Sequence, residues 1–318
     1  MLTTQRRDPN AVRSTVGGRP IVASGQAERL SAVLAWTAML AVVWLLVLSG
    51  AIRGGTIYVD SRLGNDRYQG RTPKPTGFVD GPVQTLSAAL HLVNAGDVIE
   101  LANNGVPYYG SATLYGARHS GVLSRPFEIR GNGATLTGAK PIARGCWRQT
   151  APNVWRVTPF RKAHYQLVLN GAAARETACE RTSTMLPEMP TDHWCAWRGA
   201  VYYHAPAGVI PETQRLALAD EEVGFTLIDV ENVVIRDLTL QHFRLDGVNA
   251  HDRCREIELV NVTLQENGRA GLAVGGTSQV VIRESRIQSN REASVLVTEL
   301  GEARLDASET DVAPTVVE

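Results

Sequence analysis

Three stretches of the chain share one pattern: VIRDLTL at residues 234–240, ELVNVTL at 258–264 and VIRESRI at 281–287. Their apolar positions stay in phase, because Ile235, Leu259 and Ile282 follow one another at steps of 24 and 23 residues. A fixed period of this length indicates a solenoid, in which each repeat forms one coil. The pattern therefore predicts a parallel β-solenoid.

Each repeat carries a second pair of apolar residues, separated by one outward residue. These pairs are Val248/Ala250, Leu272/Val274 and Val295/Val297. The i, i+2 spacing is typical of a strand with one buried face. With the two strands on either side of the turn at Asp237, each coil has three short strands. Crossovers between parallel strands are nearly always right-handed. We predict an all-β fold, a right-handed parallel β-helix with three-strand coils of 23–24 residues.

Polar residues recur at the predicted corners of the coils. Asp237, Asn261 and Glu284 fall in one column, and Asn267 and Asn290 fall in another. Side chains stacked at a corner can bond turn amides and carbonyls that the strand ladders leave free. The alternative is that each is an ordinary polar turn residue.

Residues 31–52 contain no charged side chain, and such a run is long enough to cross a bilayer core of about 30 Å. The preceding 30 residues hold five arginines against one aspartate and one glutamate. The positive-inside rule then predicts a disordered cytoplasmic tail at 1–30, a transmembrane signal anchor at 31–52 and an extracytoplasmic remainder in a single-pass protein of the cell membrane. Cleavage after the small residues 49–51, giving a secreted protein, is the alternative.

The chain balances 32 basic residues against 32 acidic ones, which argues against a nucleic-acid partner held by a general positive field.

Outside the cytoplasm the four cysteines, Cys146, Cys179, Cys195 and Cys254, can be oxidised. Cys179 and Cys195 are the favoured disulfide pair, and buried thiols are the alternative. Their spacing matches no zinc site, so we expect no metal or cofactor, with Ca²⁺ only under the enzyme alternative below.

The segment after the anchor begins with a short β-type run at residues 56–60. A Gly/Pro-rich loop follows, and Thr85 can cap a helix over residues 86–93. A strand is predicted from Asp97. The residues that mark this segment are Tyr58-Val59-Asp60, Gly64-Asn65-Asp66, Gly70, Gly81-Pro82, Thr85-Leu86, Ala88-Ala89, Gly96-Asp97 and Ile99-Glu100-Leu101.

This segment resembles the N-terminal signature of bacterial surface and secreted right-handed β-helix proteins of the pectate-lyase-like superfold. The resemblance covers residues 57–101 and implies that strand, helix and first coil form an N-terminal cap. Such a cap covers the apolar core that a solenoid end exposes. Because the superfold hosts lyases, hydrolases, epimerases and non-catalytic proteins, the resemblance implies mainly the fold.

The remaining boundaries follow where the coil register appears and disappears. We assign residues 55–140 to the cap and first coils, 141–222 to an aromatic-rich β insert, 223–299 to the C-terminal coils and 300–318 to an acidic, irregular tail. The insert holds four of the six tryptophans, and its Asn170-Gly171 pair after an apolar run predicts a hairpin.

The densest polar group lies at residues 244–252. Asp246, His251 and Asp252 are the candidate catalytic residues, able to form an acid/base or cation site. The alternative is a solvated turn, and the aligned outward positions of the next coils carry only Ala, Gly, Leu and Thr. No lysine follows Lys162, so the C-terminal coils cannot supply the lysine base that some β-helix lyases use.

The insert offers aromatic rings that could stack on sugars. We predict Trp194, Trp197, Tyr202 and Tyr203 as carbohydrate-binding residues, with a small core of the insert itself as the alternative.

The function favoured by these patterns is a membrane-anchored, extracytoplasmic β-helix protein associated with polysaccharide or the cell envelope. Binding or a structural role is favoured over catalysis. The alternative is a polysaccharide lyase or glycoside hydrolase that acts on acidic polysaccharide.

Overall fold

The computed structural model describes residues 54–180 and 182–317. The predicted tail and anchor, residues 1–52, lie outside the described residues. Within the described part of the chain, no helix is long and apolar enough to span a membrane.

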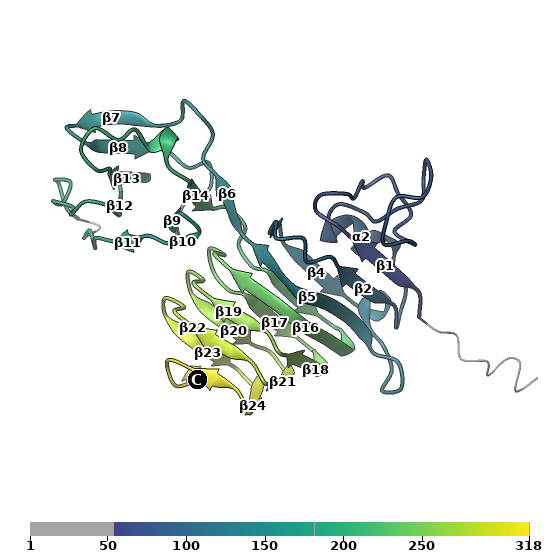
Figure 1. Ribbon diagram of the computed structural model, residues 1–318. Coiled ribbons are helices and arrows are strands. Elements are labelled where there is room, and N and C mark those ends of the chain that lie inside the picture. Colours follow the sequence, from purple (N-terminus) through teal and green to yellow (C-terminus); the bar gives the residue numbers. More distant parts are fainter. Residues whose placement is uncertain (1–53, 181, 318) are drawn as a thin grey trace, which may run out of the picture. The chain divides into compact units, whose positions relative to one another are not determined.

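The chain winds into a parallel β-helix (Figure 1). One complete coil consists of β18 (Arg255–Val260), β19 (Thr263–Gln265) and β20 (Ala270–Val274). The coil before it consists of β16 (Glu231–Gln241), which turns one corner, and β17 (Val248–Asp252). The coil after it consists of β21 (Gln279–Arg283), β22 (Arg286–Gln288) and β23 (Ala293–Thr298). The predicted three-strand coils are confirmed.

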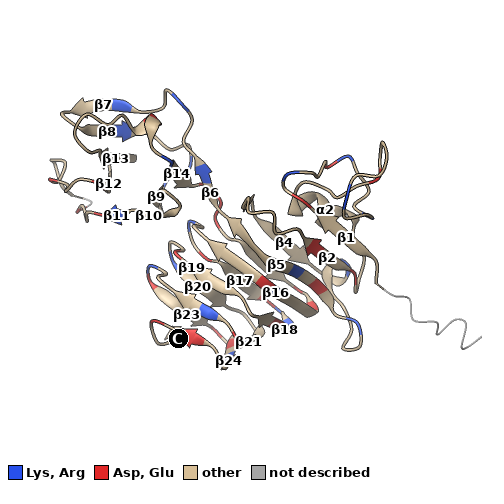
Figure 2. Ribbon diagram, in the orientation of Figure 1, with Lys and Arg blue, Asp and Glu red and all other residues tan. Residues whose placement is uncertain are grey.

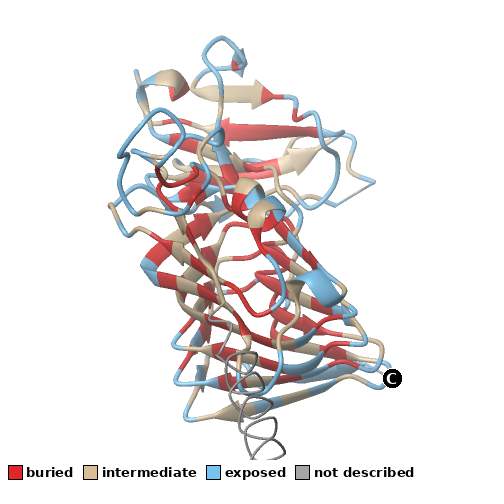
Figure 3. Ribbon diagram, turned by 90° about the vertical axis from the view of Figure 1, so that its right-hand side faces the viewer, coloured by how far each residue is buried: buried red, intermediate tan, exposed pale blue. Residues whose placement is uncertain are grey.

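The register between coils is the predicted one. Ile235 pairs with Leu259, and Leu259 pairs with Ile282. All three side chains are fully buried, as are the paired residues Val248 and Leu272 on the other sheet. Figure 3 shows buried residues recurring on strand after strand through the stack of coils. The core is thus a column of stacked apolar layers, each shared by neighbouring coils.

A residue with left-handed backbone turns one corner of each coil from β5 (Phe127–Thr137) onward, and in β5 Gly133 (φ 80°) shares this conformation with its neighbour. That column comprises Asn132 (φ 53°), Asp237 (54°), Asn261 (50°), Glu284 (51°) and Ala307 (49°). Asn and Asp tolerate this conformation better than most residues. In addition, Asn261 Nδ2 donates to Asp237 Oδ1 at 2.6 Å. The polar column predicted at this corner is therefore part of the turn itself.

The second predicted column, Asn267 and Asn290, is buried between the coils. Phe243 N donates to Asn267 Oδ1 (3.1 Å), and Asn267 Nδ2 donates to Asn290 Oδ1 (2.9 Å). Asn290 Nδ2 donates in turn to Leu264 O (3.0 Å). These amides join successive coils at a corner where strand pairing is interrupted.

Basic and acidic residues both occur on the strands of the coils (Figure 2). Arg283, for example, reaches Glu258 on one neighbouring coil (3.5 Å) and Asp306 on the other (3.7 Å). These pairs are half exposed, so each contributes little to stability.

The N-terminal cap has the predicted order: β1 (Thr56–Val59), α2 (Leu86–Leu92) and β2 (Val98–Leu101). Thr85 Oγ1 accepts from Ala88 N at 3.1 Å, so Thr85 is the N-cap. The helix ends at Leu92, one residue before the predicted end. It buries Leu86, Ala89 and Leu90 in the main apolar core.

The first coils are formed by β3 (Tyr108–Tyr109), β4 (Ala112–Tyr115), β5 (Phe127–Thr137) and β15 (Phe225–Ile228), with a short 3₁₀ helix, η1, at Ala117–His119. Strand β5 pairs with β16, and β15 pairs with both β4 and β17. One coil therefore runs from β5 to β15 and is interrupted between them by the insert.

The insert consists of two small sheets, as Figure 1 shows. One contains β6 (Ala139–Pro141), β9 (Leu167–Leu169), β10 (Ala172–Ala173) and β14 (Leu216–Ala219). The other contains β7 (Arg148–Ala151), β8 (Val154–Val157), β11 (Arg175–Glu176), β12 (His193–Trp197) and β13 (Ala200–His204), and a 3₁₀ helix, η2, lies at Pro211–Thr213. Asn170 (φ 56°) and Gly171 (φ 91°) form the predicted two-residue hairpin turn between β9 and β10.

The expectation of an irregular tail at residues 300–318 is wrong. This segment forms β24 (Glu302–Asp306), β25 (Glu309–Thr310) and β26 (Thr315–Val317), which pair in parallel with the preceding coil. Ala303 and Leu305 continue the inward column, opposite Val280 and Ile282. The acidic residues occupy outward and turn positions, where they do not oppose coil formation.

The buried asparagine column gives a stability prediction. We expect Asn267→Ala to lower the free energy of unfolding by about 2 kcal/mol, because Phe243 N and the Asn290 amide lose their partner inside the protein. The measurement is urea-induced unfolding followed by circular dichroism. Asn103→Ala, at an exposed asparagine, is the control and should change stability by less than about 0.5 kcal/mol. Equal effects of the two substitutions would contradict the role of the column.

Candidate functional site: the cleft between insert and coils

The insert is bound to the coils along one corner. His242 Nε2 pairs with Glu266 Oε2 at 2.8 Å, and the same carboxylate oxygen accepts from Ala173 N in the insert at 2.8 Å. Gln166 Nε2, also in the insert, donates to the Glu266 carbonyl at 2.8 Å. His242 is almost fully buried. Glu266 therefore connects one coil to its neighbour and to the insert.

Arg244, two residues after His242, makes a second connection between the coils and the insert. Its guanidinium is 6% exposed, and Nη2 donates to the carbonyls of Lys162 (2.7 Å) and Ala163 (2.9 Å) in the insert. Ala163 (φ 66°) and His164 (φ 49°) have left-handed backbone. Such a conformation is unfavourable for alanine, so the buried cation contributes to holding this loop in place.

A third connection joins Arg291 of the coils to Glu176 of the insert. Arg291 Nη2 lies 2.6 Å from Glu176 Oε2. From the strand register, Arg244, Gly268 and Arg291 occupy the same position in three successive coils. A side chain at Gly268 would collide with the Arg244 carbonyl oxygen, 2.2 Å from an added Cβ. The glycine therefore allows the backbones of the two neighbouring coils to approach closely at this corner.

An open cleft of about 900 Å³ lies at this place, between insert and coils. The insert lines it with Lys162, Ala163, His164, Tyr165, Glu176, Cys179, Glu180, Ala196, Trp197, Arg198 and Gly199, and the coils line it with Gly268, Arg291 and Glu292. A cavity of this size can hold several sugar residues of a chain or a small organic ligand.

Trp197 is the main aromatic surface of the cleft, and its position is well defined. Its Nε1 donates to Ser183 O at 3.1 Å, and its ring packs edge-on against Tyr202 with centroids 5.7 Å apart. The guanidinium of Arg198 lies 4.5 Å from the centre of the Trp197 ring. Arg198 covers one face of this half-buried indole, so a sugar ring would have to stack on the opposite face.

Glu176 is the most perturbed carboxyl group of the cleft. Burial raises the pKa of Glu176 above its ordinary value, and the charge of Arg291 opposes that shift without cancelling it. A carboxyl group that holds its proton more tightly than usual in a cleft can act as a general acid.

Three of the four predicted carbohydrate-binding residues are buried in the insert. Trp194 is 2% exposed, Tyr203 is fully buried and Tyr202 is 8% exposed. Trp194 Nε1 donates to Ala174 O (3.0 Å), and Tyr203 OH donates to Asp192 Oδ1 (2.6 Å). These rings form the insert's own core and cannot stack on a sugar. Of the predicted set, Trp197 alone lines the cleft.

The predicted catalytic residues do not converge. Asp246 is fully buried and accepts hydrogen bonds from Arg269 Nε (2.9 Å), Ala270 N (3.3 Å) and Asn249 Nδ2 (3.2 Å). It is a structural anion that joins two coils. His251 and Asp252 lie at the other end of β17, about 16 and 20 Å along the chain from Asp246 at the usual rise of a strand. Carboxylate pairs in glycoside hydrolases are separated by less than about 10 Å.

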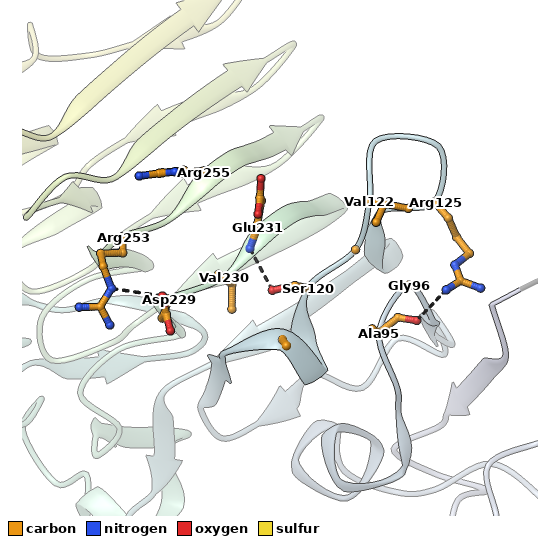
Figure 4. A pocket seen from close by; sticks show the side chains of 12 residues that line it. Ala95, Gly96, Ser120, Val122, Arg125, Asp229, Val230, Glu231, Arg253 and Arg255 are labelled. Atoms are coloured by element: carbon orange, nitrogen blue, oxygen red, sulfur yellow. Dashed lines mark hydrogen bonds and ion pairs between the residues drawn. The ribbon is translucent and has the colours of Figure 1, made fainter.

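A second cavity, of about 590 Å³, lies where the cap meets the first coil corners (Figure 4). Arg253 Nε pairs with Asp229 Oδ1 (3.2 Å) at one end, and Arg125 Nη2 donates to Ala95 O (3.4 Å) at the other. Figure 4 shows these guanidinium groups at opposite sides of the pocket. Because its cations do not converge, this cavity is a weaker candidate than the insert cleft.

The four cysteines are thiols in the structure, so the predicted disulfide between Cys179 and Cys195 is not formed. The two residues do lie in one apolar cluster of the insert. Burial raises the pKa of the Cys195 thiol to about 12. Within residues 54–180 and 182–317, no group of three or more His, Cys, Asp or Glu side chains is arranged to hold a metal ion.

The sequence matches no family model, and no curated protein resembles it significantly. Solved structures with a similar arrangement include XylC in complex with xylose, at 11% identity and a TM-score of 0.44, and pectate lyase Pel9A, at 12% identity and a TM-score of 0.37. The alignments cover 80% and 79% of this chain. The chain spans only 64% and 54% of those two proteins.

The connection through Glu266 should depend on pH. The hydrogen bond from His242 lowers the pKa of Glu266, so the folded state binds this proton less tightly than the unfolded state. The contribution of the carboxylate to stability is therefore present above its ordinary pKa of about 4.3 and is lost as the pH falls through the lower folded value.

We therefore expect the stability difference between the wild type and Glu266→Gln to shrink as the pH is lowered from 6 toward 3. The measurement is urea-induced unfolding at each pH. Glu292→Gln, at an exposed coil position, is the control and should show no such trend. A difference that stays constant with pH would contradict the assignment.

Proposed function

We propose that this protein is a membrane-anchored, extracytoplasmic right-handed β-helix protein that binds a polysaccharide of the cell envelope in the cleft between insert and coils. The observation that supports this most is the half-exposed Trp197 ring beside charged groups of both signs in an open cleft of about 900 Å³. Binding, rather than turnover, is the function we favour.

The cleft has the chemistry that saccharide recognition requires. A sugar ring has apolar faces, which pack on aromatic rings, and a rim of hydroxyl groups, which pair with charged and amide groups. Trp197 and Tyr165 supply aromatic surface, while Glu176, Arg291 and Lys162 supply donors and acceptors. Because both signs of charge are present, the site does not require a polyanionic saccharide.

The anchor is proposed from the sequence of residues 31–52 and from the arginine-rich segment before it. A long uncharged run preceded by positive charge favours an anchor that leaves the following residues outside the cytoplasm. The membrane and a polysaccharide are then the two proposed partners.

Trp197→Ala should weaken saccharide binding about fivefold, because stacking on an aromatic ring contributes about 1 kcal/mol beyond burial. We would identify a ligand with a glycan array and measure its Kd by titration calorimetry. Phe160→Ala, which removes a fully exposed ring of the same insert outside the cleft, is the matched control. Equal affinities of Trp197→Ala and the control would contradict the site. Trp194→Ala is unsuitable as a probe, because Trp194 is a core residue.

A glycoside hydrolase or polysaccharide lyase remains a second candidate, favoured by the raised pKa of Glu176 in the same cleft. Glu180 and Glu292 supply further carboxylates there. Hydrolysis needs a protonated acid next to a second carboxylate, and Glu176 is the group best suited to the first role.

Incubation of the protein with neutral and uronate polysaccharides, with and without Ca²⁺, tests this candidate. If the protein is a hydrolase, reducing ends should appear, and Glu176→Gln should reduce their rate at least a hundredfold. Glu188→Gln, at an exposed position of the insert outside the cleft, is the control for a general loss of carboxylate. We expect no cleavage. New reducing or unsaturated ends that depend on Glu176 would overturn the preference for binding.

A further inference from the structure

The surface of the N-terminal cap carries exposed apolar residues on one loop. The cap loop, defined here as residues 61–80, connects β1 to the segment before α2. Phe78 is the most exposed large apolar side chain in the described part of the chain, at 102%, and Leu63 (57%) and Val79 (51%) are also exposed. An ordinary loop tip seldom presents phenylalanine fully to water, so this loop is a candidate contact surface.

The same loop carries four exposed cations. Arg62, Arg67, Arg71 and Lys74 are all exposed, and within residues 54–180 and 182–317 none of them forms an ion pair.

The loop has only two carboxylates, Asp66 and Asp80, against these four cations. Asp66 accepts from Gln84 N and Thr85 N, at 2.8 and 2.9 Å. Asp80 is the remaining exposed carboxylate. The loop therefore presents a surplus of positive charge together with its apolar side chains.

Backbone hydrogen bonds hold Gly70 and Gly81, which bound the outer part of the loop, next to β1. Tyr58 N donates to Gly70 O (2.8 Å), and Gly70 N donates to Gly81 O (3.0 Å). Thr76 N donates to Asp80 O (2.9 Å), which places Phe78 inside a closed turn. The ring is thus presented by a loop with its own backbone hydrogen bonds.

One residue of the loop, Arg71, lies beside the start of β1, where the described chain begins. Gly55 N donates to Asp97 Oδ1 (2.6 Å), and a Cβ on Gly55 would lie 2.5 Å from Nη1 of Arg71. Arg71 is therefore next to Gly55. The uncharged run at 31–52 ends two residues before Gly54, a separation of at most about 7 Å along the chain.

We infer that the cap loop is a membrane-contact surface. Phe78 and Val79 insert into the interfacial region of the bilayer, and Arg62, Arg67, Arg71 and Lys74 contact anionic lipid headgroups. Exposed aromatic and basic side chains together are the features that bind peripheral segments to such a surface. This inference rests on the proposed anchor, which would bring the cap to the bilayer. It adds a second contact with the bilayer, made by the cap loop itself.

The test uses the full chain reconstituted in vesicles of phosphatidylcholine and phosphatidylglycerol. In a background of Cys146→Ser and Cys179→Ser, Phe78→Cys is labelled with an environment-sensitive fluorophore. Phe160→Cys, at 97% exposure in the insert, carries the same label as the matched control. The readouts are flotation of the protein with the vesicles, and quenching of the label by nitroxide lipids.

We expect the protein to float with the vesicles and the label at position 78 to be quenched several-fold more than the label at 160. Arg71→Glu combined with Lys74→Glu should reduce this quenching, as should vesicles of phosphatidylcholine alone. Flotation with equal quenching at both positions would overturn the inference and leave the anchor intact. Failure to float would overturn the anchor and the inference with it.

Discussion

Backbone pairing between successive coils is the interaction on which the rest of this structure depends. A single three-strand coil has no partner for its own amides and carbonyls and cannot cover its own inner face. Stacking at about 4.8 Å per coil satisfies both needs at once. The column Ile235, Leu259, Ile282 fills the interior, and the left-handed residues at the corners let each strand turn without losing register. Insertion of one residue into a strand would turn the inward side chains beyond that point in the strand to its outer face.

The coil spacing also determines where the insert can bind. The insert interrupts one coil between β5 and β15, and it contacts the three coils that begin with β16, β18 and β21. Arg244, Glu266 and Arg291 lie on those three coils, so their separation follows from the stacking distance. Gly268 lets the coil backbones approach closely at this corner. The cleft is thus a consequence of attaching a separately folded insert to a regular corner.

The coil architecture could be predicted from sequence because it repeats. Three features follow directly from local residue types. They are the 24- and 23-residue steps, the buried asparagines and the Asn170-Gly171 turn. The last coil was missed because it has only Ala303 and Leu305 as inward residues in its first strand, among many acidic ones. Periodicity is a weak signal when apolar residues are few.

The site was harder to predict, because side chains of the insert have no repeat to place them. Trp194, Tyr202 and Tyr203 were assigned to a surface and lie in a core, since alternation within one short strand does not say which face is covered. Asp246 looked like part of a polar cluster, but its partner Arg269 comes from the next coil. The recurrence of arginine at Arg244 and Arg291, two coils apart at one corner, was the available signal for the cleft.

Hydrogen exchange of the full chain, measured by mass spectrometry with and without the saccharide that binds best, tests the central claim most directly. The claim is that ligand binds between the insert and the coil corner. It predicts new protection at residues 162–165 and 196–199 of the insert and at 268 and 291–292 of the coils. Protection confined to the outer face of β17, around His251 and Asp252, or absent from the insert, would contradict it.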